Sequence, residues 1–561
     1  MFKFPNPQTK DPKERMVQRS LEVIPGILTW MTLIGMPLLS FIVPAWVALF
    51  IIVFDIYWIY RTIFISSYSV LAYKKLQYGK TLDWWEKCQN TLDLESYLEE
   101  LESRIDKVKG SVRGKIFVKN RRSIRKEMRH LNQSVLDVRN LMKIKDQIMD
   151  WRRVVHVVML PTAGETADII EPALKAIDKS NFPNKQIIIL LATEERENEE
   201  MRLKKVNYLK SKFDGVFRDF IVTTHEVQEG EMKCKASNAT FAAKKLVKYL
   251  DEKGVDYKDV IFSNFDCDSI CHEQYFAALT YSYVIDPKRL QRSYQPIPMY
   301  HNNLWDTNAF VRVIVTSSSF WHMYQSTRKE MVTFSSHSEP FDTLVKVDFW
   351  PVNMISEDSI IYWKCFSYFS SDYEVKPIYL PVSLDAVLAE TYWKTIKNQY
   401  LQKRRWAYGI ENFPVIMRAI WKDKKIKFSK KFSILFEMLE GHHSWATAPF
   451  ILALLGWLPL IFGGSQFSES ELAHKLPYIT RTLMSLAMMG LFISMSLSFL
   501  LMPNRPKRYS KTKYIYMFLQ WALVPIIAPT LGALPAIESQ TRILFKRYFT
   551  EFWVTEKMKK K

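Results

Sequence analysis

The chain has 561 residues, 48% of them hydrophobic, and a formal net charge of +20. This length is sufficient for several domains. A net positive charge is typical of proteins that bind nucleic acid or anionic lipid. No nucleic-acid recognition motif accompanies the charge here, so we expect no nucleic-acid binding. The hydrophobic residues are concentrated in long stretches near both ends. Lysines and arginines that orient membrane spans from the cytoplasm therefore explain the charge better.

The N-terminal region predicts a membrane hairpin. Residues 1–22 are polar, and the apolar stretch after them is too long for the core of a signal peptide. It divides at Pro44 into spans at 23–41 and 43–65, each close to the length that crosses a bilayer. Basic residues flank both spans, which places both ends of the hairpin in the cytoplasm. We assign 1–72 to this tail and transmembrane hairpin.

Residues 73–150 predict a cytoplasmic helical-hairpin insert. Leu94, Leu98, Leu101 and Ile105 recur at helical spacing, and a second set of apolar residues does so over 124–142. The segment 106–122 between them is rich in lysine and arginine and forms a basic tip. The five cysteines of the chain form no CxxC pair and no zinc spacing with histidine, so we expect free thiols in a reducing compartment.

Residues 151–430 predict an α/β domain. Short apolar runs at 154–161, 186–191, 220–222 and 260–262 have the character of strands. Helical patterns at 164–180, 197–212 and 236–253 separate them. This alternation indicates a mostly parallel sheet with helices on both faces. Such sheets bind ligands at the carboxyl ends of their strands.

Residues 431–561 predict an interfacial helix and a C-terminal transmembrane region with a basic tail. Spans are expected at 446–463 and 482–502, with an acidic loop outside between them and a basic loop inside after them. A further apolar segment, 514–537, contains three prolines. A full crossing there would place the basic tail outside. We therefore expect a proline-broken segment that is re-entrant or interfacial.

Two acidic motifs follow apolar or loop segments of the central domain. Asp266 and Asp268 come directly after the fourth predicted strand, where two carboxylates can meet a divalent ion and the diphosphate it bridges. A solvated loop is the alternative. Glu357 and Asp358 precede a helical stretch at 359–369. They either cap that helix or supply a general base for an attacking alcohol.

Two basic motifs accompany them. Lys235 opens a predicted helix, where a lysine and backbone amides could hold phosphate, or the lysine could simply be exposed. Gln402, Arg405 and Trp406 share one face when read as helix. An amide, a bidentate cation and a flat aromatic suit phosphate and a sugar ring. The alternative is a basic amphipathic helix lying on a membrane.

Taken in order, these motifs resemble the membrane-embedded family-2 glycosyltransferases, the group that includes cellulose, hyaluronan and chitin synthases. The resemblance covers roughly 150–445 and implies a GT-A-like (Rossmann-like) cytoplasmic glycosyltransferase domain flanked by transmembrane helices. The hydrophobic C-terminal part, which ends with 552–557, is similar to the family's membrane end. The matching residues are Leu160-Pro-Thr162, Lys235-Ala-Ser-Asn238, Asp266-Cys-Asp268, Glu357-Asp358 and Gln402-Lys-Arg-Arg405-Trp406.

The resemblance also implies roles for individual residues. Asp268 would ligate a divalent metal, Mg²⁺ or Mn²⁺, and Asp358 would be the catalytic base. The residues implied in binding the nucleotide sugar, its diphosphate and the acceptor terminus are Thr162, Lys235, Asn238, Asp266, Glu357, Gln402, Arg405 and Trp406.

The chain departs from the family after the second strand. Where the family has an aspartate pair that contacts the base or ribose, this chain has Glu194 and Glu195. Either carboxylate can accept a hydrogen bond from a base N–H. The choice between a UDP-sugar and a GDP-sugar therefore stays open.

The segment 293–350 has two interpretations. It is rich in tryptophan, tyrosine, histidine and serine, which could line a groove for the acceptor. It could equally be a packed lid over the domain. The residues in question are Trp305, Trp321, His322, Ser335, Ser336, His337 and Trp350.

We therefore expect an inverting transferase in the cell (inner) membrane that extends a glycan at the cytoplasmic face, a processive β-polysaccharide synthase. Its partners would be a nucleotide-diphosphate sugar, a glycan or lipid-linked acceptor, and membrane lipid. One alternative is a non-processive transferase onto a lipid-linked acceptor. Another is a non-catalytic membrane scaffold with a decayed site. A transporter is disfavoured, because Asp55 alone is charged in mid-span.

Overall fold

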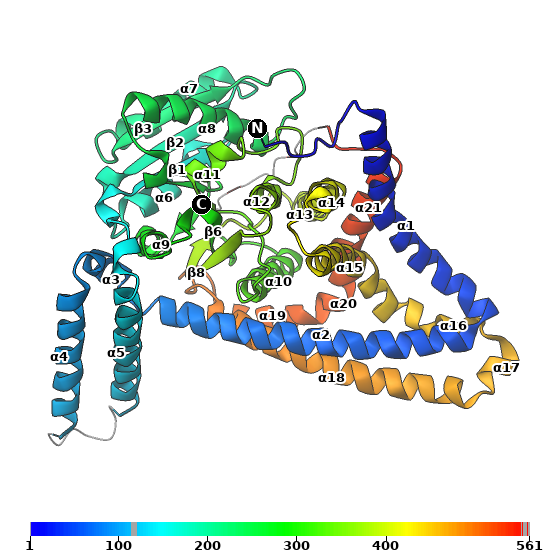
Figure 1. The fold of residues 1–561 in the computed structure, drawn as a ribbon. Coiled ribbons are helices and arrows are strands. Elements are labelled where there is room, and N and C mark those ends of the chain that lie inside the picture. Colours follow the sequence, from blue (N-terminus) through cyan, green and yellow to red (C-terminus); the bar gives the residue numbers. More distant parts are fainter. Residues whose placement is uncertain (1, 114–120, 551–552, 554–557, 559–561) are drawn as a thin grey trace.

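The computed structural model describes residues 2–113, 121–550, 553 and 558. Figure 1 shows a sheet domain with helices on both faces, a helical hairpin projecting from one side, and a group of long helices along another side. Part of the predicted basic tip, 114–120, lies outside the described residues, as does 552–557 apart from Trp553.

An eight-stranded sheet forms the centre of the domain, in the order β3-β2-β1-β4-β7-β6-β8-β5. The strands β3, β2, β1 and β4 pair in parallel, which confirms the sequence prediction for this half. The other half is mixed, because β7 pairs antiparallel with β4 and β6, and β5 pairs antiparallel with β8. The strands are β1 (Val155–Pro161), β2 (Ile187–Glu194), β3 (Asp219–His225), β4 (Val260–Asn264), β5 (Ile270–Cys271), β6 (Arg292–Met299), β7 (His337–Pro340) and β8 (Glu374–Ser383).

Helices cover both faces of the sheet, which explains why its inner strands are continuously apolar. In β1, Val157 and Met159 pack on the face that carries α8, α12 and α14, whereas Val158 and Leu160 pack on the opposite face with α6, α7 and α9. The helices of the domain are α6 (Ala167–Asp178), α7 (Glu199–Lys212), α8 (Lys235–Glu252), α9 (Tyr275–Val284), α10 (Ala309–Gln325), α11 (Phe341–Lys346), α12 (Glu357–Tyr368), α13 (Tyr392–Ala407) and α14 (Asn412–Lys422).

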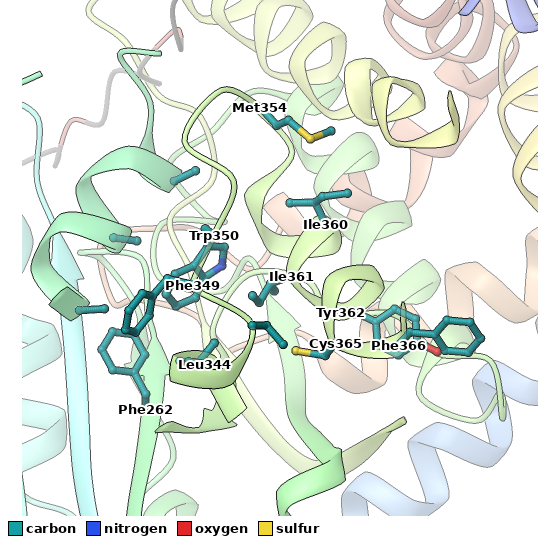
Figure 2. Packing of buried hydrophobic residues seen from close by; sticks show 14 of the residues in the cluster. Phe262, Leu344, Phe349, Trp350, Met354, Ile360, Ile361, Tyr362, Cys365 and Phe366 are labelled. Carbon is teal, nitrogen blue, oxygen red and sulfur yellow. The ribbon is translucent and has the colours of Figure 1, made fainter. Parts of the chain in front are cut away.

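A buried aromatic cluster fixes α12 against the sheet. Figure 2 shows Phe349 and Trp350 beside Phe262 of β4, with side chains of α12 continuing the cluster. The rings of Phe262 and Trp350 lie 5.7 Å apart, and both side chains are buried. Because the helix is held here along its length, its first turn is fixed close to the carboxyl end of β4.

Two helices next to the domain form the predicted hairpin insert. The short α3 (Trp84–Gln89) leads into α4 (Leu94–Arg113), which pairs with α5 (Arg121–Met142). Leu101 and Ile105 of α4 pack with Val135 and Val138 of α5. The five cysteines, all within the described residues, are free, as expected.

Among the described residues, four helices are long and apolar enough to cross a membrane: α1 (Pro12–Ile42), α2 (Pro44–Gly79), α18 (Glu471–Leu501) and the helical run Lys513–Leu544. A fifth is added if α15 (Phe428–Ala453) and α16 (Leu458–Phe462), bent by 51°, count as one span. The helix α1 begins well before the predicted residue 23, because Asp11 caps it and Pro12 occupies its first position. Likewise α2 continues past residue 65 and packs on α10 and β8.

The proline-rich segment after α18 is broken, as the prolines suggest. It consists of α19 (Lys513–Leu519), a 3₁₀ turn at Gln520–Leu523, α20 (Val524–Ile527), a π-helical stretch at Ala528–Ala533 and α21 (Leu534–Leu544). Before it, α17 (Gly464–Ser468) connects α16 to α18. In Figure 1, α21 lies beside α1 and α13, with which it makes close contact. This segment therefore joins the long helices to the helix that carries Gln402, Arg405 and Trp406.

Candidate active site

A single cavity of about 980 Å³ collects most of the predicted site residues. It lies at the carboxyl ends of β1, β2 and β4, where a parallel sheet is expected to bind its ligand. The first turn of α12 and one face of α13 close it from the other side. The predicted residues that line it are Thr162, Glu194, Lys235, Asp266, Asp268, Glu357, Asp358, Gln402, Arg405 and Trp406.

Two predicted residues lie elsewhere. The Asn238 amide donates a hydrogen bond to the Ala192 carbonyl at 3.0 Å, so it fastens α8 to β2. It is buried and does not line the cavity. Glu195 is exposed in the turn after β2, and it does not line the cavity either. Of Glu194 and Glu195, therefore, Glu194 alone lines the cavity.

Lys235, the first residue of α8, is the electrostatic centre of the site. Its ammonium lies 2.8 Å from Asp266 Oδ1, 3.4 Å from Glu357 Oε1 and 3.5 Å from Asp358 Oδ1. Burial opposes the charge on this lysine, but the three carboxylates raise its pKa above the usual value. One cation thus holds together the two acidic motifs that the sequence places about ninety residues apart.

Asp266 and Asp268 are held in different ways. Ser335 Oγ donates to Asp266 Oδ2 at 2.6 Å. The backbone N–H of Asp385 donates to Asp268 Oδ2 at 2.9 Å, and Asp268 is buried. Within the described residues, no three side chains of histidine, cysteine, aspartate or glutamate gather as a ligand set. Mg²⁺ commonly takes one or two carboxylates and completes its shell with substrate phosphates and water, and these two carboxylates at one cavity fit that pattern.

Glu357 and Asp358 occupy the first turn of α12, and their surroundings distinguish them. Burial and the neighbouring Asp358 raise the pKa of Glu357, which favours its protonated form. The Asp358 side chain is about one-third exposed to the cavity, at 29%. Asp358 is therefore the carboxylate of this pair that is open to an incoming hydroxyl.

Glu411 positions the start of α12, although it belongs to none of the sequence motifs. Its Oε1 accepts from the backbone N–H groups of Ile355 and Ser356 at 2.8 and 2.9 Å, and from Ser356 Oγ at 2.8 Å. Burial raises the pKa of Glu411 to about 7, against the opposing effect of these donors. Because Glu411 follows α13 directly, it connects the Gln402-to-Trp406 helix to the Glu357-Asp358 turn.

A buried histidine and glutamate stand behind Asp358. His337 Nδ1 lies 2.6 Å from the Phe334 carbonyl and 3.6 Å from Asp358 Oδ1, and its Nε2 lies 3.4 Å from Glu339 Oε1. Both side chains are fully buried in β7. Since a carbonyl can only accept, Nδ1 carries the proton and donates it to Phe334, while Asp358 Oδ1 lies farther away.

The end of β2 offers a second charged pair to the ligand. Glu194 and Arg196 form a salt bridge and both line the cavity. Burial raises the pKa of Glu194, and Arg196 opposes that shift. Close by, Thr162 Oγ1 donates to Glu197 at 2.9 Å and accepts from Lys205 at 3.0 Å. By the resemblance, the nucleotide base is expected at this end of β2, beside Glu194 and Arg196.

The predicted face of α13 is present as a helix. Gln402 is buried and accepts from Gln399 Nε2 at 3.1 Å, and the Trp406 ring lies 6.1 Å from that of Tyr300. Arg405 donates to the Trp553 carbonyl at 2.9 Å. Burial lowers the pKa of Arg405, an effect that the carboxylates of the site oppose. All three side chains line the cavity, which favours the ligand-binding interpretation of this face.

The cavity continues beyond Trp406 into a part that no motif marked. Here α2, α10 and α15 supply the lining, largely aromatic and paired charged residues. Of the segment 293–350, Trp321, His322 and Ser335 line the cavity, whereas Trp305 and Trp350 are buried in packed cores, so both interpretations of that segment hold in part. The missed lining residues include Tyr57, Trp58, Arg61, Phe64, Ser318, Tyr324, Arg328, Lys403, Glu437, Glu440 and Trp445.

The chain matches no protein-family model and no curated protein. Among solved structures, it is similar to a mannosyltransferase of Pyrobaculum calidifontis in complex with GDP-Man and Mn²⁺, with 14% identity over 60% of this chain and 87% of that one and a TM-score of 0.37. It is also similar to residues 1–349 of S. aureus TarS in complex with UDP-GlcNAc, with 10% identity over 71% and 93% and a TM-score of 0.33. At TM-scores this low, neither similarity indicates the function of this chain.

Proposed function

We propose that this protein is a membrane-bound, metal-dependent inverting glycosyltransferase that takes a sugar from a nucleotide-diphosphate donor. The observation that carries the proposal is the convergence of Asp266, Asp268, Asp358 and Arg405 on one cavity. Two carboxylates for a metal diphosphate, one accessible base and a buried guanidinium are the parts that such a transfer needs.

The donor binds at the sheet edge. Glu194 and Arg196 take the nucleotide base, and Asp266 and Lys235 lie along the path of the diphosphate. Arg405 approaches the phosphates from α13, because a guanidinium matches their oxygens bidentately. Mg²⁺ or Mn²⁺ held by Asp268, with Asp266, would neutralise charge on the leaving diphosphate.

Asp358 acts as the base in a single displacement. It takes the proton from the acceptor hydroxyl, whose oxygen bonds to the anomeric carbon as the bond from that carbon to the diphosphate oxygen breaks. The electron pair leaves with the nucleoside diphosphate. An α-linked donor thus gives a β-glycoside. Glu357, kept protonated, does not compete with Asp358 as the base.

The acceptor terminus lies against Trp406, on the far side of the base from the nucleotide. Sugar rings stack on flat aromatic faces, and Tyr300 and Trp406 provide two. In this proposal the enzyme lies in the cell (inner) membrane, and its sheet domain lies on the cytoplasmic side, where nucleotide sugars occur. A growing glycan and a lipid-linked saccharide both present such a terminus. The resemblance to cellulose, hyaluronan and chitin synthases favours a processive β-polysaccharide synthase.

Release of nucleoside diphosphate from purified protein in detergent tests the proposal. UDP- and GDP-sugars are supplied in turn with Mn²⁺, with Mg²⁺ or with a chelator. We expect release with one nucleotide class, dependent on the metal. Release from no donor in the presence of added membrane lipid, or release that is unaffected by the chelator, would contradict it.

A further inference from the structure

Lys403 occupies an unusual position in the cavity. Its ammonium lies 4.8 Å from the centre of the Trp406 ring and 5.5 Å from that of Trp445, and it donates to Ser318 Oγ at 3.2 Å. Three helices, α10, α13 and α15, therefore meet around it. The residue lines the cavity together with Ser318, Trp406 and Trp445.

The neighbouring cations of the cavity are neutralised, whereas Lys403 makes no ion pair with any described residue. Arg61 pairs with Glu440, Arg328 with Glu437 at 2.8 Å and Lys430 with Glu330 at 3.3 Å. Burial lowers the pKa of Lys403 to about 8, as expected of a cation without a counter-ion. Placing such a group beside a cavity costs stability unless a ligand supplies the missing charge.

This part of the cavity reaches the surface of a helix that is apolar enough to cross a membrane. Tyr57, Tyr60 and Phe64 of α2 line the cavity, yet Tyr60 remains 62% exposed. Where they line the cavity, α2 and α15 contact each other through polar side chains: Tyr57 Oη donates to Glu440 Oε1 at 2.6 Å, and Arg61 contacts Glu440. Elsewhere along the same two helices, Ile51 packs with Ile451. Side-chain contacts of this kind can open by rotamer changes, without movement of either helix backbone.

Resting on the proposed function, we propose that the acceptor is an amphiphile whose anionic group pairs with Lys403 and whose apolar part leaves the cavity between α2 and α15. The two tryptophans flank the anionic group and the tail continues past the aromatic residues of α2 into lipid. A neutral glycan would fit the aromatic rings but would leave Lys403 without its counter-ion. Charge complementarity therefore favours an acceptor that carries a phosphate or a carboxylate.

Thermal unfolding of the full chain in detergent, without any donor, tests this proposal. The probes are farnesyl phosphate, farnesol and inorganic phosphate, each titrated separately. We expect farnesyl phosphate to raise Tm at lower concentration than farnesol or inorganic phosphate does. In Lys403→Gln this preference should be lost, with farnesyl phosphate binding at least about tenfold more weakly, the value of a charge-assisted hydrogen bond.

Two variants serve as matched controls. Lys403→Arg keeps the positive charge and should keep the preference for farnesyl phosphate. Lys394→Gln makes the same substitution on the same helix outside the cavity and should behave as the wild type. Equal binding of farnesol and farnesyl phosphate, or unchanged binding in Lys403→Gln, would overturn the proposal.

Binding of inorganic phosphate also distinguishes an amphiphile site from a free-phosphate site. Inorganic phosphate that binds as tightly as farnesyl phosphate, and depends on Lys403, would indicate a free-phosphate site and overturn the amphiphile. Because the binding assay requires no turnover, its result does not depend on whether the protein is a transferase. Failure of nucleoside diphosphate release with a positive binding result would reject the transferase and leave the amphiphile site in place.

Discussion

Two lysines show how differently the two parts of the cavity are built. Lys235, at the sheet edge, lies within 3.5 Å of three carboxylates, which together raise its pKa although burial opposes the charge. Lys403 lies in the part of the cavity lined by α2, α10 and α15, named here the membrane-side part because α2 is long and apolar enough to cross a membrane. Two aromatic rings and a hydroxyl surround it, and burial lowers its pKa to about 8. The first lysine is balanced by the protein, and the second is not.

The difference indicates a division of labour. In the sheet-edge part, acidic and basic groups neutralise one another before any ligand arrives, which keeps the carboxylates proposed as base and metal ligands in place. In the membrane-side part, the protein leaves one positive charge uncompensated beside aromatic surfaces. Substitutions at the first part should therefore impair chemistry and folding, whereas those at the second should alter acceptor binding.

The largest effect is expected from Asp358→Asn. Loss of the general base should lower the rate of sugar transfer by about 10²- to 10⁴-fold, while the affinity for the nucleotide sugar should be retained. Turnover and equilibrium binding are measured in parallel. Asp372→Asn, an exposed aspartate paired with Lys288, is the control and should leave both unchanged. Equal turnover in Asp358→Asn would remove Asp358 from the mechanism.

Replacing each lysine by methionine should shift stability in opposite directions. Lys235→Met leaves three carboxylates without their cation and should lower the free energy of unfolding by about 3 kcal/mol. Lys403→Met removes an uncompensated charge and places an apolar chain between two tryptophans, so it should be neutral or stabilising by about 1 kcal/mol. Thermal unfolding at pH 7 compares them. Loss of stability in both variants would contradict the comparison.

The pH dependence of folding stability tests whether the charge of Lys403 is uncompensated. Its pKa is about 8 in the folded state and about 10.4 in an unfolded chain. Between these values the unfolded state binds the extra proton, so the stability of the wild type rises with pH in this window. The advantage of Lys403→Met should therefore shrink from pH 8 to pH 10. A constant difference across this window would show that Lys403 is paired.

A smaller effect is expected from Glu357→Gln. Because burial and Asp358 favour the protonated form of Glu357, an amide of the same shape should preserve most of the turnover, within about tenfold of the wild type. The steady-state rate is measured beside that of Asp358→Asn. If the two variants lose activity equally, the division of roles between these carboxylates is wrong.

The smallest effect is expected from Glu411→Gln, which should change how the Tm depends on pH. The pKa of Glu411 is raised to about 7, so between about pH 4.3 and pH 7 the folded state keeps a proton that the unfolded state has lost. In the wild type this contribution lowers stability as pH rises through that window. Glu411→Gln should lack it, so the Tm curves of the two proteins should diverge most between pH 5 and pH 7.

The sequence revealed the parts of the site that are encoded locally. Runs such as 186–191 identified strands, and Asp266, Asp358 and Arg405 were recognisable because each motif is compact. Lys235 was recognised, but its contact with both acidic motifs depends on the crossing of α8 and α12, which no spacing reveals. The mixed half of the sheet was missed because β7 follows a long insertion, where strand–helix alternation has stopped.

The membrane-side part of the cavity could not have been predicted in this way. Arg61 and Glu440 meet although nearly four hundred residues separate them, and neither belongs to a motif. His337 and Glu411 act through contacts that exist only once β7, α12 and α13 are packed together. The aromatic composition of 293–350 was the one available signal, and it marked Trp321 correctly and Trp350 incorrectly as cavity candidates.

The most direct test of the central claim is the anomeric configuration of the first product. Proton NMR on the donor identified by nucleoside diphosphate release, with water or a saccharide as acceptor, follows the anomeric signal before mutarotation. With an α-linked donor, a single displacement assisted by Asp358 predicts that the β-anomer appears first. An α-anomer appearing first would require two displacements, and it would contradict the assignment of Asp358 as the base of an inverting transferase.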